Sequence, residues 1–149
     1  MSSPEELVQL AGQLHEIGRF YRAEGKRSHS YEGVTLTDSE IWALCVMSGS
    51  EGITQNDLGR RILISKSAVS SLAERLEQKG LIRRDRAGVS YQLFLTDLGR
   101  KVCQASQEAC YRWANEMAEA IPVELEELKA ANRVLEAIKT YLGQKYMPN

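Results

Sequence analysis

Four polar side chains near the middle of the chain have types and spacing suited to holding a polyanion. They supply one ammonium group and three small hydroxyls: Lys66, Ser67, Ser70 and Ser71. Apolar residues alternate with them at steps of three and four, as on one face of a helix: Val69, Leu72, Ala73 and Leu76. The pattern predicts a helix over residues 65–79 with one buried face and one polar face.

The chemistry expected of the polar face is hydrogen bonding and charge attraction. Small hydroxyls allow close approach to base edges in a major groove, and a helix N-terminus attracts phosphate. The alternative is that the serines only cap the helix and keep it soluble.

The sequence around this segment is basic, although the whole chain is almost neutral. Residues 54–101 contain ten lysines and arginines against five acidic residues, a net charge of +5, whereas the whole chain carries −1. A basic middle between acidic ends is typical of a protein with one face for a polyanion. A chance distribution of charged residues can give the same pattern, so the charge alone does not establish a surface that binds a polyanion.

No other side chains have the spacing of a catalytic or metal site. His15 and His29 lie outside any spaced ligand cluster, and the cysteines form no Cys-x-x-Cys pair. Cys103 and Cys110 would lie about 10 Å apart along one helix, too far to bridge within it. Cys45 lies in an apolar run and is expected to be a small buried hydrophobe. We therefore expect no metal, no cofactor and no enzyme.

Capping residues mark the helices that must position the polar face. Helix starts are predicted at five of them: Ser3, Thr37, Thr54, Ser65 and Thr96. The helix from Ser65 is expected to end at Gly80, and the first helix at Gly25. The helix from Thr96 is expected to run to about Ile121, with apolar stripes on two sides, and Pro122 to start the last helix.

Two other segments are expected to be non-helical. Residues 26–35 are predicted to form a polar loop. Leu81–Arg84 and Tyr91–Leu95 are strand-like runs on either side of Gly88, which predicts a short hairpin. The order helix, short helix, tight turn, helix, hairpin is that of a winged helix-turn-helix. The expected fold class is mainly α with a small β-hairpin wing (α+β).

Five runs in this order resemble the MarR family of bacterial regulators: Leu36–Thr37, Ile53–Arg61, Ser65–Leu72, Arg75–Arg84 and Leu95–Gly99. The resemblance covers residues 36–100 in detail. It implies a DNA-binding domain over residues 36–97, with dimerisation segments over residues 1–35 and 98–149. It also implies a sequence-specific transcription regulator, expected to be a repressor, that binds pseudo-palindromic double-stranded DNA as a homodimer. The alternative, from another class, is a winged-helix module that binds protein and not DNA.

Two apolar stripes support the expected homodimer. They lie near the two ends of the chain: Leu7, Leu10, Leu14 and Ile17 in the first, and Leu128, Leu135, Ile138 and Leu142 in the second. A winged domain of about 65 residues is too small to cover both stripes. The alternative is that the two stripes pack against each other within one chain.

Roles for the polar residues follow from the resemblance and from residue type. Groove contacts are expected from Lys66, Ser67, Ser70 and Ser71, and phosphate contacts from Thr54, Gln55 and Ser65. Arg83, Arg84 and Arg86 are expected to supply the charge of the wing. Arg75 would contact either a phosphate or a nearby acid.

The sequence departs from the family at three places. Asp85 and Arg86 are adjacent, where members usually have Asp-x-Arg in a longer wing. Ser71 stands where an arginine is common, and the turn around Leu63 lacks the frequent glycine.

Family members often bind a small aromatic effector. Five aromatic residues could line such a pocket, or belong to the core as aromatics more often do: Tyr21, Tyr31, Trp42, Tyr111 and Trp113. The effector-binding residues therefore stay unassigned. The polar N-terminus and the lack of a long apolar stretch predict a cytoplasmic protein with no membrane contact.

Overall fold

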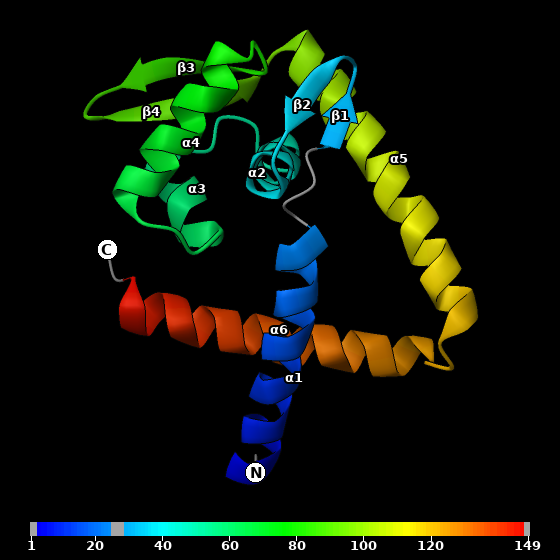
Figure 1. The fold of residues 1–149 in the computed structure, drawn as a ribbon. Helices are drawn as coiled ribbons and strands as arrows, with labels where there is room; N and C mark the ends of the chain where they lie inside the picture. The colour runs from blue at the N-terminus through cyan, green and yellow to red at the C-terminus, as the bar shows by residue number, and fades with distance from the viewer. Residues whose placement is uncertain (1–2, 25–28, 148–149) are drawn as a thin grey trace.

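The computed structural model describes residues 3–24 and 29–147. Its elements are six helices and two small antiparallel hairpins (Figure 1): α1 (Pro4–Glu24), β1 (His29–Tyr31), β2 (Val34–Leu36), α2 (Asp38–Ser48), α3 (Gln55–Arg61), α4 (Lys66–Gln78), β3 (Ile82–Ala87), β4 (Ser90–Leu95), α5 (Asp97–Ala120) and α6 (Leu125–Tyr146). The predicted fold class, mainly α with a small β wing, is confirmed.

Side-chain caps start five of the helices. At each, the side-chain oxygen accepts a hydrogen bond from the backbone N–H three residues later, over 3.0–3.3 Å: Ser3, Thr37, Thr54, Ser65 and Thr96. All five predicted starts are confirmed. The predicted end at Gly25 lies outside the described residues.

The core lies between α2, α3, α4, the wing and the first turns of α5. Its fully buried leucines come from every one of these parts except α5, and from β2: Leu36, Leu44, Leu58, Leu72, Leu76, Leu81 and Leu93. The helix α5 joins the core through Val102 and Cys103. Gly99 permits this approach, because a Cβ there would lie 2.0 Å from the carbonyl oxygen of Leu81.

The wing is longer than the sequence predicted. β3 and β4 pair in register from Ile82–Leu95 to Ala87–Ser90, so both strands reach a two-residue turn that contains Gly88 at φ 64°. An isolated bridge from Thr54 to Gln92 extends the sheet. The prediction of a short hairpin was wrong because charged residues break the apolar alternation, whereas strand pairing follows the backbone.

A second hairpin occupies most of the segment that was predicted to be a polar loop. Tyr31 pairs with Val34 across a turn in which Glu32 and Gly33 have φ angles of 52° and 75°. Two residues with positive φ make the tight turn that matches the twist of a hairpin. Tyr31 and Val34 pack against the core and so attach this hairpin to it.

The last helix starts later than predicted. Pro122 ends α5, and α6 starts after the N-cap residue Glu124. Ile121 is extended, with φ −109° and ψ 134°, as expected for a residue that precedes proline. Pro122 therefore acts as a helix stop and does not lie in the first turn of α6.

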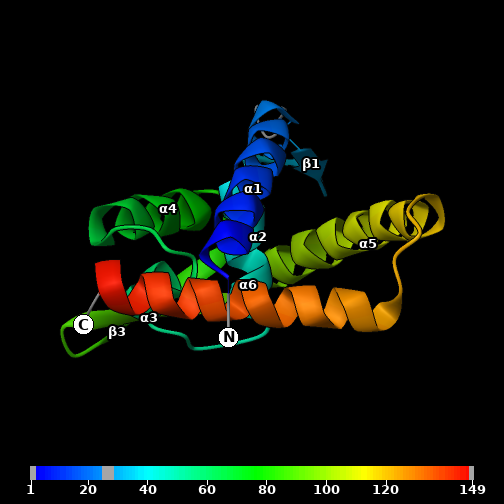
Figure 2. The same cartoon turned by 90° about the horizontal axis from the view of Figure 1, so that it is seen from below.

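The three long helices lie to one side of the winged core (Figures 1 and 2). α5 leads away from the core, α6 returns beneath it, and α1 crosses α6. Only the first turns of α5 are buried, so the predicted packing on two sides is not found along the rest of the helix in the single chain. No helix in the described part of the chain is long and apolar enough to span a membrane.

Candidate nucleic-acid interface

The helix α4 has one buried face and one open face. Val69, Leu72, Ala73 and Leu76 are each at most 1% exposed. The opposite face carries the predicted polar residues: Lys66, Ser67 and Ser71 are exposed, and Ser70 is half-buried. The core therefore fixes the position of the helix while its serine face stays free.

The N-terminus of α4 is suited to an anion. Each of the other five helices has a carboxylate in its first turn, whereas α4 has none and starts with Lys66. A carboxylate there would offset the positive end of the helix dipole. In α4 this charge is left for an external anion such as a phosphate.

A buried ion pair fixes the C-terminal half of α4. Glu40 on α2 has a side chain only 2% exposed, and its Oε2 lies 2.5 Å from Nζ of Lys79. Lys79 also donates to the carbonyl oxygen of Thr35 over 2.8 Å. Arg75 lies beside the same carboxylate, with Nε 3.6 Å from Oε1. The Arg75 side chain, expected to contact a phosphate or an acid, therefore pairs with an acid.

The sequence did not predict this role of Glu40. Glu40 has the spacing of the acidic partner in a capping box with Thr37. Its N–H does donate to Thr37, but its carboxylate turns to α4. Lys79 is 39 residues away, so no local pattern joins the two.

Two of the three wing arginines are engaged within the protein. Arg84 donates to Glu77 on α4 from Nε and Nη2, over 3.2 and 3.0 Å, and its side chain is only 16% exposed. Arg83 makes a two-bond pair with Asp85, over 2.9 and 3.1 Å, and lies over the ring of Phe94. The hydrogen bond to Asp85 raises the pKa of Arg83.

Arg86 has a different environment at the end of the wing. Its Nη1 donates to the hydroxyl of Tyr91 over 3.1 Å, and its guanidinium lies 5.3 Å from the centre of that ring. In the described part of the chain, neither Arg86 nor Lys66 has an ion-pair partner. Among the basic side chains of α4 and the wing, these two are therefore the most available for phosphates, a distinction that the sequence did not predict.

Two of the three residues expected to hold phosphates at the helix ends already use their hydroxyls in hydrogen bonds within the protein. The hydroxyls of Thr54 and Ser65 accept the capping hydrogen bonds of α3 and α4, and Ser65 Oγ lies 3.2 Å from Ser67 Oγ. Gln55 is half-buried, and among the described residues its Oε1 has no hydrogen-bond partner.

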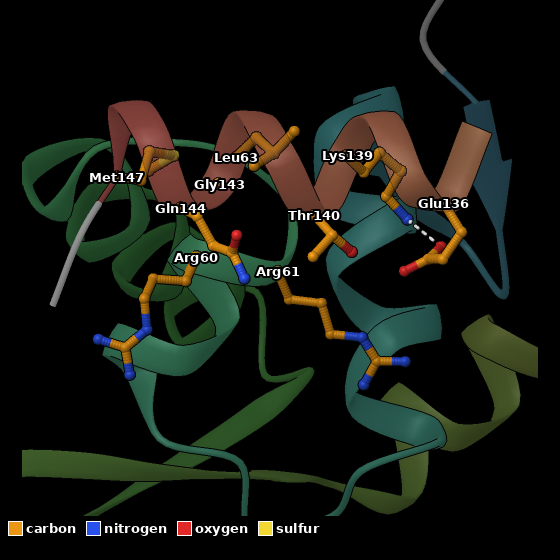
Figure 3. Close-up of a pocket in the computed structure, with 9 residues that line it drawn as sticks. All are labelled: Arg60, Arg61, Leu63, Glu136, Lys139, Thr140, Gly143, Gln144 and Met147. Atoms are coloured by element: carbon orange, nitrogen blue, oxygen red, sulfur yellow. Dashed lines mark hydrogen bonds and ion pairs between the residues drawn. The ribbon is translucent and has the colours of Figure 1, made fainter. Parts of the chain in front are cut away.

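A second feature is an open cleft between α6 and the winged core (Figure 3). One part has a volume of about 500 Å³ and is lined by residues of α3 and α6, including Arg60 and Glu136. An adjoining part of about 530 Å³ includes Trp42 and Cys45 of α2. Arg61, Leu63 and Lys139 line both parts, and Lys139 is paired with Glu136 over 3.0 Å (Figure 3).

The five aromatic residues considered for an effector pocket do not converge on one site. Tyr21 and Trp113 meet edge to face, with ring centres 6.3 Å apart. Trp42 lines the cleft, Tyr111 is exposed, and Tyr31 packs against the core. Within the residues that the structure covers, no three His, Cys, Asp or Glu side chains form a group that could hold a metal ion.

Comparisons with known proteins agree with this geometry. A family model described as the MarR family matches residues 33–89. An uncharacterised HTH-type transcriptional regulator of Bacillus subtilis, YdgJ, is 27% identical over 124 residues, which span 80% of this chain and 70% of that protein.

Solved structures with the same fold match almost the whole chain. FabT of Streptococcus pneumoniae, solved in complex with DNA, has a TM-score of 0.67 and 16% identity, and the match covers 93% of this chain and 98% of that one. PcaV of Streptomyces coelicolor, solved with its natural ligand, has a TM-score of 0.64 and 20% identity, with 93% and 96% covered. Identities this low support similarity of fold alone.

Proposed function

We propose that the chain is a MarR-family transcriptional regulator, which the match of residues 33–89 to that family and the winged helix-turn-helix fold support, and that it represses transcription by binding pseudo-palindromic DNA as a homodimer. The observation that carries the proposal is the open serine face of α4, which lies opposite a fully buried face. Its place in the cell is then with the genome, in the cytoplasm.

In this proposal residues 36–97 bind the DNA. The N-terminal half of α4 enters the major groove, where Lys66, Ser67, Ser70 and Ser71 contact base edges. Arg86 reaches a phosphate or the minor groove from the end of the wing. Arg83 and Arg84 hold the shape of the wing, and the helix starts at Thr54, Gln55 and Ser65 approach the backbone of the DNA.

The test is selection of bound duplexes from a random-sequence pool with the full-length protein. We expect one enriched pseudo-palindrome whose half-sites lie about one helical turn apart. Its affinity should fall by at least about tenfold between 50 and 200 mM salt, because bound cations release counterions from the phosphates. No retained duplex at low salt would contradict DNA binding and favour the protein-binding alternative.

Residues 1–35 and 98–149 form the dimer interface in this proposal. Five of the eight predicted interface residues are 37–51% exposed in the single chain: Leu7, Leu14, Ile17, Leu128 and Leu142. The other three, Leu10, Leu135 and Ile138, are half-buried. Leu10 and Leu135 line an apolar groove between α1 and α6, so the two stripes meet in part within one chain and still leave a large apolar surface.

Light scattering on the eluting protein tests the dimer. We expect twice the 16.7 kDa mass of one chain. Leu128→Glu should shift the mass to that of the monomer, because it places a charge in the apolar interface. Val89→Glu, at a fully exposed position in the wing, is the matched control and should remain dimeric. A monomeric wild type would contradict the proposal.

An effector is proposed for the cleft beside Trp42. Trp42 offers an aromatic surface, and Arg61 and Lys139 offer charge for an acidic group, so the ligand would be a small aromatic acid. Benzoate titrated into Trp113→Phe, which retains Trp42 as its single tryptophan, should quench the fluorescence and release bound DNA. Equal quenching in Trp113→Phe with Lys139→Ala would contradict this site.

A further inference from the structure

The wing carries an aromatic ring that contacts two guanidinium groups. The centre of the Tyr91 ring lies 4.9 Å from the guanidinium carbon of Arg84 and 5.3 Å from that of Arg86. Arg86 and Tyr91 pair directly across the two strands, and Arg84 lies two residues before Arg86 on β3. Residues that pair across strands, or lie two apart on one strand, point to the same side, so all three share one face of the wing.

This face of the wing is the one that meets α4. Leu93, which pairs with Arg84 across the strands, is fully buried in the core. Arg84 donates to Glu77 of α4 from its backbone N–H, Nε and Nη2, over 3.3, 3.2 and 3.0 Å. Tyr91 packs against the edge of the core, whereas Arg86 is exposed. Arg86 therefore lies on the side of the wing that a duplex bound to α4 would approach.

Tyr91 restrains Arg86 and leaves its charge uncompensated. The hydroxyl oxygen of Tyr91 accepts a hydrogen bond from Nη1 of Arg86 over 3.1 Å, and the face of the ring attracts the guanidinium. A guanidinium has five N–H donors, and within the described residues this contact uses one of them. Arg84 differs, because the carboxylate of Glu77 compensates its charge.

A guanidinium held in this way is suited to a phosphate. A planar guanidinium can donate two parallel hydrogen bonds to phosphate oxygens. An arginine that enters the minor groove must extend away from its strand, whereas the contact with Tyr91 keeps the Arg86 side chain along the face of the wing. A side chain that is ordered before binding also loses less conformational freedom on binding, which raises the affinity.

We propose that Tyr91 is a positioning residue that holds the guanidinium of Arg86 against the wing and directs it at one phosphate of the DNA backbone. This role rests on the proposed function, since the ligand is the duplex that α4 binds. The order of the Arg86 side chain in the free protein does not depend on DNA, so it is measured separately. Tyr91 acts through Arg86 alone, and its loss should have no further effect once Arg86 is removed.

The first measurement is the affinity of single and double variants for the selected duplex and for a random duplex. Tyr91→Leu should weaken both by about fivefold, because residues in contact are coupled by this order of free energy. In the Arg86→Ala background, the same replacement should change the affinity by less than about twofold. Tyr91→Phe keeps the ring and its packing on the core, and should lose only the share of the hydroxyl, about twofold.

The second measurement is made on the free protein by 15N relaxation of the Arg86 Nε–H group, which Arg86→Ala identifies. In the wild type we expect an order parameter close to the roughly 0.85 of a rigid backbone, and in Tyr91→Leu a value below about 0.6. Phe94→Leu is the matched control, because Phe94 lies on the other face of β4 beneath Arg83, which Asp85 holds. It should change neither the order of Arg86 nor the affinity.

Three results would overturn the proposal. They are additive losses in the double variant, an Arg86 whose order is the same in Tyr91→Leu as in the wild type, and a loss of affinity confined to A·T-rich duplexes, which would place Arg86 in the minor groove. If the wild type binds no duplex, the proposed function fails and the phosphate contact fails with it. A rigid Arg86 that Tyr91→Leu releases would in that case still support the positioning role of Tyr91.

Discussion

Nζ of Lys79 lies 2.5 Å from Oε2 of Glu40, and this contact joins the C-terminal end of α4 to α2. The Glu40 side chain is 2% exposed, and its carboxylate lies between Lys79 and Arg75. Removing a buried carboxylate that lies between two cations leaves both cations without their counter-charge.

We expect Glu40→Ala to lower the free energy of unfolding by about 3 kcal/mol, because Lys79 is left partly buried without its counter-charge. Urea denaturation measures the change. Glu126→Ala is the control: its pair with Lys129 is exposed on both sides and should cost at most about 1 kcal/mol. Equal losses in the two variants would show that the buried pair is not special.

The wing arginines should differ in their effect on DNA binding. Arg86→Ala should weaken binding to every duplex and reduce the slope of log affinity against log salt by about 1, because one phosphate contact is lost. Arg84→Ala should leave that slope unchanged and lower thermal stability instead, since Arg84 bridges β3 and α4. Fluorescence anisotropy at several salt concentrations checks both. A lower slope for Arg84→Ala but not for Arg86→Ala would show that Arg84, and not Arg86, contacts the phosphate.

Leu63 has a left-handed backbone, with φ 59°, in the turn before α4. A residue with a Cβ pays about 1 kcal/mol in this conformation. We expect Leu63→Gly to be more stable than Leu63→Ala by about that amount, because both variants lose the same leucine contacts. At Ala118, exposed in α5, replacement by glycine should instead cost about 1 kcal/mol. Thermal unfolding compares them, and a Leu63→Ala more stable than Leu63→Gly would contradict the strain.

Much of the fold was predictable because its signals are local. A serine or threonine three residues before the N–H that it caps is visible in sequence, and all five predicted helix starts are found. The alternation of Val69, Leu72 and Leu76 with serines likewise gave the two faces of α4. The hairpin of β1 and β2 was not predicted because its turn, Glu32–Gly33, lies in a polar segment without the usual asparagine or aspartate.

The interactions that determine which residues are engaged within the protein and which are free join residues that are distant in sequence. Glu40 and Lys79 are 39 residues apart. Arg83, Arg84 and Arg86 are similar in sequence, and only the pairing of β3 beside α4 shows which of them is engaged. Such contacts depend on packing, which a single sequence does not specify.

In the proposed function, the open face of α4 reads base sequence. The decisive experiment measures the affinity of Lys66→Ala with Ser67→Ala for the selected duplex and for a random duplex of equal length. We expect the ratio of the two affinities to fall by at least about tenfold, because base-edge contacts are lost. Lys129→Ala, on the exposed side of α6, should leave the ratio unchanged. An unchanged ratio in the α4 variant would show that this face does not read base sequence.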